Sequence, residues 1–301
     1  MSSSVSALRR KRLAVSSMTA IAIWIGALMI LLLSEPTMAL LALASGAYAA
    51  LLAGLTAWLI PKTDVPEPDT VLRASGTRRA LALRIAVVVA AVVWTAAFGV
   101  ERGGFKVPLL TPLLKSLQTV RLAPHLDGFV LHNFFSLALI PGILLIALGT
   151  RPRELGLCAP VRGTLKATLA CLAYPLIMVI WAFTSKGLTI AGLFFWLLHN
   201  LLSNGFSEEF FARGMILSHL RARLKTDWAL VLQALIFALL HAGGTIPEEH
   251  GNPARIIANV VGLNFPMGLA LGFMAIRSRS LLLPTLVHIS LDTMKDLLGM
   301  Q

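Results

Sequence analysis

The chain has 301 residues, of which 57% are hydrophobic and 13% are charged, and its mean hydropathy is +0.80. An ordinary soluble domain has about 45–50% apolar and about 25% charged residues, so the composition excludes that class and predicts an integral membrane protein. The formal net charge of +12 does not indicate a nucleic-acid partner. The basic residues stand in short segments between apolar runs, where they report orientation in the membrane.

Apolar runs of nearly bilayer-crossing length recur along the whole chain. They predict an all-α, polytopic transmembrane helical bundle of about 8–9 spans, at residues 14–33, 38–60, 80–100, 127–148, 165–183, 189–219, 228–243, 255–276 and 280–298. The first run follows a basic cluster, as a secretory signal does, but it is too long for a signal core and is expected to remain as a span.

The Lys and Arg residues divide unevenly between the two sides of these spans. One side holds seven: Arg102, Lys106, Lys115, Arg121, Lys186, Arg255 and Lys295. The other side holds eighteen of the 26, since Arg213 falls within a span. This positive-inside bias predicts a multi-pass cell-membrane protein with a cytoplasmic N-terminus and an external C-terminus.

Two membrane regions are expected. Residues 1–125 hold three spans and an external loop from Glu101 to His125, in which a short interfacial helix is expected. The segment from Pro61 to Arg79 is predicted to be a solvated cytoplasmic loop. Residues 126–301 hold the polar residues, so the last four spans are expected to form a polar intramembrane cavity.

The sixth predicted span contains SEEFFARG, from Ser207 to Gly214. Glu209 and Arg213 are four residues apart on one helix face, so they are expected to pair and to position the helix. Glu208 is turned about 100° away and shares its face with Asn200 and Asn204. It has no basic neighbour on its own helix, so burial would increase its basicity unless another helix compensates, which makes it the candidate general base.

Two later spans carry histidines. Gln233, Phe237 and His241 form one stripe, and His241 lies at the same predicted depth as Glu208. A lone histidine in an apolar helix is more often a satisfied core residue, and the matched depth is what favours a function. His288 and Asp292 are four residues apart on the last span, where a hydrogen-bonded structural pair is an equal alternative. The eighth span offers Gly268 and Gly272, whose spacing predicts close helix packing.

The segments EEFFAR, FALLH and HISLD resemble, in this order, the three motifs of the CPBP family of CAAX proteases and bacteriocin-processing proteins, also called ABI or type II CAAX endopeptidases. The motif residues are Glu208, Glu209 and Arg213, then Phe237 and His241, then His288 and Asp292. The resemblance covers roughly Pro152 to Leu298 and does not explain the first three spans. We therefore describe residues 126–301 as a CPBP-like catalytic membrane domain.

The resemblance implies an intramembrane glutamic endopeptidase, similar to CAAX prenyl protease 2. Glu208 and His241 would activate a water molecule, while His288 and Asp292 would stabilise the oxyanion. Because an ionised Asp cannot donate a hydrogen bond, we expect Asp292 to orient His288 instead. Arg213, Glu209, Phe237 and Asn204 are expected to position these groups. The expected partners are the lipid bilayer and a protein or peptide substrate presented from the membrane.

Alternatives remain open at this point. A non-catalytic immunity or scaffold protein of the same fold is possible, because a fold does not guarantee an activity. No cofactor is expected, but zinc is not excluded, since two histidines and Glu208 resemble a His-His-Glu site. A transporter is disfavoured because no internal repeat of interrupted helices is visible in the sequence.

Overall fold

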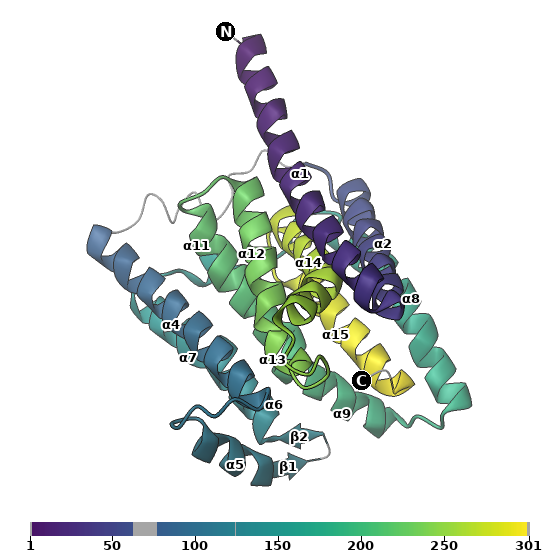
Figure 1. The fold of residues 1–301 in the computed structure, drawn as a ribbon. Coiled ribbons are helices and arrows are strands. Elements are labelled where there is room, and N and C mark those ends of the chain that lie inside the picture. Colours follow the sequence, from purple (N-terminus) through teal and green to yellow (C-terminus); the bar gives the residue numbers. More distant parts are fainter. Residues whose placement is uncertain (1, 63–76, 124, 300–301) are drawn as a thin grey trace.

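The computed structural model describes residues 2–62, 77–123 and 125–299 (Figure 1). Residues 63–76 of the predicted cytoplasmic loop lie outside this range. The helices before the three motifs are α1 (Ser2–Ser34), α2 (Pro36–Leu59), α4 (Arg78–Arg102), α5 (Thr111–Thr119), α6 (Gly128–Asn133), the π-helix η1 (Phe134–Leu139), α7 (Ile140–Ala147), the 3-10 helix η2 (Pro152–Leu155) and α8 (Thr164–Ser185).

The motif-bearing part is also helical. Its helices are α9 (Ile190–Asn200), the π-helix η3 (Leu201–Gly205), α10 (Phe206–Glu209), the π-helix η4 (Phe210–Leu217), α11 (Ser218–Arg221), α12 (Thr226–Leu240), α13 (Ala242–Thr245), α14 (Pro253–Ser278) and α15 (Leu282–Leu298). The protein is a multi-pass helical membrane bundle, as the composition predicts.

Helices occupy all nine of the predicted spans. Within the described residues, seven of them are long and apolar enough to cross a membrane: 15–34, 36–59, 78–102, 128–147, 164–185, 226–245 and 253–278. The two other predicted spans correspond to the segmented helix from α9 to α11 and to α15. These two carry Glu208, Glu209, Arg213, His288 and Asp292, so polar side chains set them apart from the apolar spans.

Successive long helices alternate in direction, which gives the bundle two ends (Figure 1). We call the end at which α4, α8 and α12 begin the N-face, because α1 also begins on that side. We call the opposite end the C-face; there α4 and α15 end, and there α5 and the β1–β2 hairpin lie. The direction of each long helix agrees with the order of the predicted spans.

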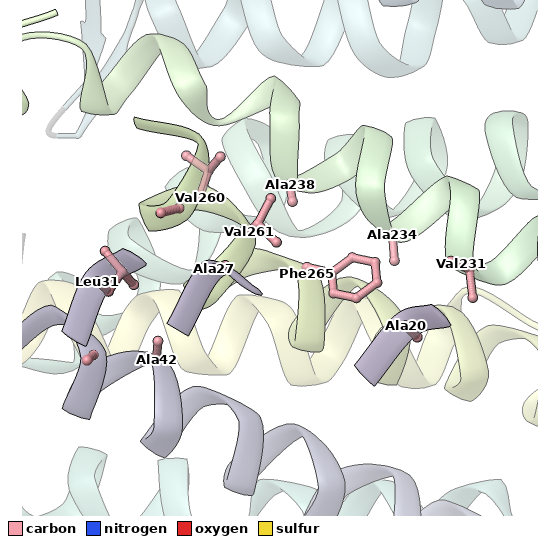
Figure 2. Close-up of a cluster of buried hydrophobic side chains, with 12 residues drawn as sticks. Ala20, Ala27, Leu31, Ala42, Val231, Ala234, Ala238, Val260, Val261 and Phe265 are labelled. Carbon is pink, nitrogen blue, oxygen red and sulfur yellow. The ribbon is translucent and has the colours of Figure 1, made fainter. Parts of the chain in front are cut away.

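Helix α14 lies at the centre of the bundle. In its most apolar window 67% of the residues are buried, against 22% for α1, α2 and α4, which expose many apolar side chains. Such exposed apolar surface suits lipid. One buried cluster joins α1 and α2 to α12 and α14 through small residues around Phe265 (Figure 2): Ala20, Ala27, Leu31, Ala39, Ala42, Val231, Ala234, Ala238, Ala258, Val260 and Val261.

The glycines of α14 allow its neighbours to approach closely. A Cβ atom added at Gly268 would lie 3.0 Å from the Cα atom of Ala234, and one added at Gly272 would lie 2.8 Å from Oε1 of Gln233. The prediction that these two glycines serve helix packing is confirmed, and their partner is α12.

The loop after α4 has its own structure at the C-face. Helix α5 confirms the predicted short helix, and its first turn is tied to α4 because Oγ1 of Thr111 donates to Oε1 of Glu101 at 2.6 Å. Strands β1 (Arg121–Ala123) and β2 (Leu126–Asp127) then form a short antiparallel pair that the sequence did not predict. Asp127 caps α6 by accepting from the backbone N–H groups of Phe129 and Val130.

Candidate active site

The helix that carries EEFFAR runs from Ile190 to Arg221 and contains two π-helical segments, η3 and η4. A π turn holds an extra residue, so it changes which side chains share a face and often occurs at functional sites. The four residues of α10, Phe206 to Glu209, lie between these segments. Both glutamates are therefore presented from a short regular turn flanked by two irregular ones.

Glu209 and Arg213 form the predicted pair. Nη1 of Arg213 lies 2.8 Å from Oε1 of Glu209, and neither side chain is exposed to solvent. Nη2 of Arg213 donates to the carbonyl oxygen of Gly268 at 3.3 Å, and the guanidinium lies 4.3 Å from the ring centroid of Phe237. This arrangement locks the helix against α12 and α14, and each charge reduces the cost of burying the other.

Phe237 is the common neighbour of the charged groups. Its ring centroid is 4.7 Å from that of His241 and 6.4 Å from that of His288, both edge-on, and its other neighbour is Arg213. Phe237 is itself buried. The predicted positioning role therefore has a physical basis, because the ring separates Arg213 from the imidazoles and fixes their orientations.

His241 ends α12 with one ring nitrogen already engaged. Its Nδ1 lies 2.8 Å from the carbonyl oxygen of Phe237, and a carbonyl can only accept, so Nδ1 carries the hydrogen. In the neutral ring Nε2 is then an acceptor. That atom lies 3.6 Å from Oε2 of Glu208, and the His241 side chain is 33% exposed.

Glu208 is held differently from its neighbour Glu209. Its Oε2 lies 3.6 Å from Nε2 of His241 and 3.9 Å from Nε2 of His288, and within the described part of the chain this oxygen has no hydrogen-bond partner. A separation beyond 3.5 Å between polar groups is characteristic of a bridging water. Sequence reasoning placed Glu208 and His241 at matching depth, and the structure brings them together.

His288 lies between carboxylates on both sides of its ring. Nδ1 is 2.8 Å from Oε1 of Glu209, and Nε2 is 3.3 Å from Oδ2 of Asp292. Two carboxylates at these distances favour the imidazolium form, in which both ring nitrogens carry a hydrogen. In that form His288 places a positive charge beside Glu208.

Asp292 is surrounded by donors. Besides His288, it accepts from Nδ2 of Asn204 at 3.2 Å and pairs with Nζ of Lys295 at 2.6 Å. An aspartate that accepts from three groups is ionised, so it orients His288 and does not itself donate. The geometry agrees with this predicted role and with the positioning role of Asn204.

Lys295 pairs with Asp292, and the sequence analysis did not predict this contact. It was counted only as a basic residue on the external side, although its i, i+3 spacing from Asp292 was a signal for a pair. Three carboxylates, those of Glu208, Glu209 and Asp292, now face three cations: Arg213, Lys295 and protonated His288. In the neutral form of His241, Nε2 is an acceptor that faces Glu208.

A regular α-helix would place Asn200 on the same face as Asn204 and Glu208, but the surroundings of Asn200 differ from theirs. Asn200 is 1% exposed, and its amide donates to Oγ1 of Thr293 at 3.1 Å and to Oδ2 of Asp296 at 2.8 Å. It therefore joins the catalytic helix to α15 and does not face water. The π segment η3 lies between Asn200 and Glu208 and is the physical reason for the difference, because the prediction placed both residues on a regular α-helix.

A cavity of about 230 Å³ lies next to Glu208 and His241. It is lined by Thr95, Phe98, Gly99, Arg102, Asn133, Leu137, Asn204, Glu208, Phe211, Phe237, Leu240, His241 and Gly244. The prediction that the last four spans form the walls of this cavity is only partly right. The segmented helix from α9 to α11 and the α12–α13 helices contribute lining residues, but α14 and α15 contribute none. The other lining residues belong to α4, α6 and η1, so one of the first three spans faces the candidate catalytic groups.

A second polar network, also missed from the sequence, lies at the C-face. Arg255 pairs with Glu35, which precedes α2, and its Nε lies 2.8 Å from Oε2 of Glu249. Nδ2 of Asn259 donates to Oε1 of Glu249 at 3.0 Å. This network fixes the α13–α14 loop to the α1–α2 connection, so Asn259 serves structure.

No group of three or more His, Cys, Asp or Glu side chains with metal-binding geometry occurs within residues 2–62, 77–123 and 125–299. The chelator experiment described below tests the zinc alternative.

Comparison with known proteins identifies one family. Residues 189–294 match the family model "Type II CAAX prenyl endopeptidase Rce1-like", from the N-cap of α9 to Met294 in α15. No curated protein and no solved structure matches the chain. The matched region contains all three motifs, it excludes α4, and it ends one residue before Lys295.

At family level the match supports a membrane-embedded CAAX-type protease. Residues 189–294 of this multi-pass membrane protein are therefore similar to the Rce1-like family, which agrees with the resemblance of the three motifs.

Proposed function

We propose that the chain is an intramembrane endopeptidase of the glutamic type, which hydrolyses a peptide bond of a protein or peptide presented from the membrane. One observation carries this proposal. Oε2 of Glu208 and Nε2 of His241, which are both acceptors when the imidazole is neutral, lie 3.6 Å apart beside a cavity. A water molecule that donates one hydrogen to each is the partner that such a pair needs.

The reaction follows from this arrangement. Glu208 and His241 take a proton from water as its oxygen attacks the peptide carbonyl. The carbonyl oxygen becomes negative, and the positive charge of the His288 imidazolium, which Glu209 and Asp292 hold in place, stabilises it electrostatically. The tetrahedral intermediate then loses its C–N bond, and the proton taken from water passes to the departing amine nitrogen. No covalent acyl-enzyme is formed.

Comparison of protein termini in cell membranes tests the proposal. Cells expressing Glu208→Gln are expected to lack a set of new termini that cells with the natural chain produce. General-base catalysis contributes about 10²–10⁴-fold, so loss of the base should remove these products. Glu248→Gln is the matched control, because Glu248 is an exposed glutamate in the α13–α14 loop. Its termini should equal those of the natural chain.

His241→Ala should lose the same termini as Glu208→Gln, while both variants accumulate normally in the membrane. A non-catalytic scaffold makes the opposite prediction, since its cellular effect would survive Glu208→Gln and would be lost only when the Glu209–Arg213 pair is broken. Unchanged processing by Glu208→Gln would therefore contradict the proposed function.

A further inference from the structure

The cavity beside Glu208 lies toward the C-face on each long helix that lines it. On α4 the lining residues run from Thr95 to Arg102, where this helix ends. On α12 they begin at Phe237 and continue past the helix end at Leu240. Arg102 and Gly244 are exposed, so the cavity reaches solvent at this end.

The opposite end of the cavity is closed. Every residue of η4, from Phe210 to Leu217, is buried, and this helix lies on the N-face side of Glu208. Phe211, Met215 and Ile216 belong to an apolar cluster that also contains Val88 of α4 and Leu137 of η1. The buried Glu209–Arg213 pair adds to this barrier. The described residues between Glu208 and the N-face are therefore closely packed, whereas the cavity beside Glu208 is open at the C-face.

The charges identify which face that is. The helix ends and loops at the N-face carry twelve Lys and Arg residues after α2: Arg78, Arg79, Arg84, Arg151, Arg153, Arg162, Lys166, Arg221, Arg223, Lys225, Arg277 and Arg279. Among the described residues, the C-face carries the seven Lys and Arg residues given above. Short basic loops remain in the cytoplasm, so the N-face is cytoplasmic and the C-face is external.

From these observations we infer that the catalytic cavity opens to the non-cytoplasmic side of the membrane. The substrate class is then an exported polypeptide, or the external juxtamembrane segment of a membrane protein, and not a protein terminus in the cytosol. The statement about substrate rests on the proposed function, whereas the statement about access does not.

Cysteine labelling in intact cells tests the direction of access. Gly244→Cys places a thiol in the cavity wall, and an added Cβ there meets no atom within 4 Å. Ala159→Cys is the matched control, since Ala159 is exposed in the N-face loop between η2 and α8. The chain with only its native cysteines gives the background, because Cys171 is 2% exposed and Cys158 lies in the N-face loop.

A membrane-impermeant maleimide is expected to label Gly244→Cys equally in intact and in permeabilised cells, and to label Ala159→Cys only after permeabilisation. Lys106→Cys, on the exposed loop after α4, should behave as Gly244→Cys and reports the C-face without altering the cavity. Labelling of Gly244→Cys only after permeabilisation, or in neither condition, would overturn the inference.

The same labelling in the Glu208→Gln background separates the two proposals. Its pattern should be unchanged, because access does not depend on catalysis. If the labelling is as expected but no termini depend on Glu208, the proposed function fails and the direction of access stands. If termini do depend on Glu208, they should map to segments outside the cytoplasm, and cytosolic cleavage sites would contradict the substrate class.

Discussion

The adjacent residues Glu208 and Glu209 belong to two different clusters of side chains. Glu209 belongs to a closed network with Arg213 and His288, in which contacts of 2.8 Å join the fully buried Glu209 and Arg213 to the mostly buried His288. Glu208 belongs to an open pair with His241, at 3.6 Å and beside a cavity. A turn of about 100° between consecutive helical residues is enough to separate them. The comparison shows how one helix turn supplies both a rigid support and a group that is free to react.

The largest expected effect on stability distinguishes these two clusters. Glu209→Gln should destabilise the protein by about 3–5 kcal/mol, because it leaves the Arg213 charge buried without its counter-charge. Glu208→Gln should leave the melting temperature in detergent nearly unchanged while it removes cleavage. Thermal unfolding of both purified variants, with Glu248→Gln as control, measures the difference. Equal melting temperatures for the two variants would contradict the division into two clusters.

A second test concerns the support of His288. Asp292→Ala should cost about 1–3 kcal/mol, because it leaves His288 and Asn204 without their shared acceptor. The rate of cleavage should fall as well, since His288 loses its orientation. Asp292→Asn keeps one acceptor oxygen and should retain more activity than Asp292→Ala. Higher activity in the alanine variant would show that Asp292 does not position His288.

A smaller effect is expected at Lys295, at the edge of the closed network. Its side chain is 52% exposed, so the pair with Asp292 should contribute no more than about 1 kcal/mol to stability. Lys295→Met should slow cleavage only modestly, because it leaves the Asp292 charge less compensated. Lys115→Met, at an exposed lysine of α5, is the control. A melting temperature reduced as strongly as that of Glu209→Gln would contradict this ranking.

The smallest expected effect is that of a chelator. If the open pair activates water without a metal, cleavage by the purified protein in EDTA or phenanthroline should equal that in buffer. Loss of activity with chelator and its recovery with added zinc would instead assign Glu208 and the histidines to a metal site.

The sequence predicted the charged and histidine residues of the candidate site better than the residues that line the cavity. Charged motifs inside apolar runs are rare, so Glu208, Glu209, Arg213, His241, His288 and Asp292 could be found by spacing alone, and a regular helix correctly predicted the Glu209–Arg213 pair. The π segments could not be predicted, because a local pattern does not reveal an extra residue in a turn. Asn200 was therefore placed on the same face as Glu208, whereas its side chain contacts Thr293 and Asp296.

The cavity wall from α4 was beyond sequence reasoning for a different reason. Thr95, Phe98 and Gly99 carry no chemical signal, and their position beside Glu208 depends on packing between segments more than a hundred residues apart. The same holds for the contact between Glu35 and Arg255. Whether residues 1–125 and 126–301 are separate units stays a prediction, although α4 contributes to the cavity and β1 pairs with β2 across that boundary.

The buried helix η4 has a consequence for the energetics of the cell. A hydrolase in the bilayer must bring water to the depth of Glu208, yet a continuous column of water between the two faces would conduct protons. Because every residue from Phe210 to Leu217 is buried, the cavity ends beside Glu208 and His241. If the proposed function holds, this arrangement supplies the reaction with water while the membrane keeps its proton gradient.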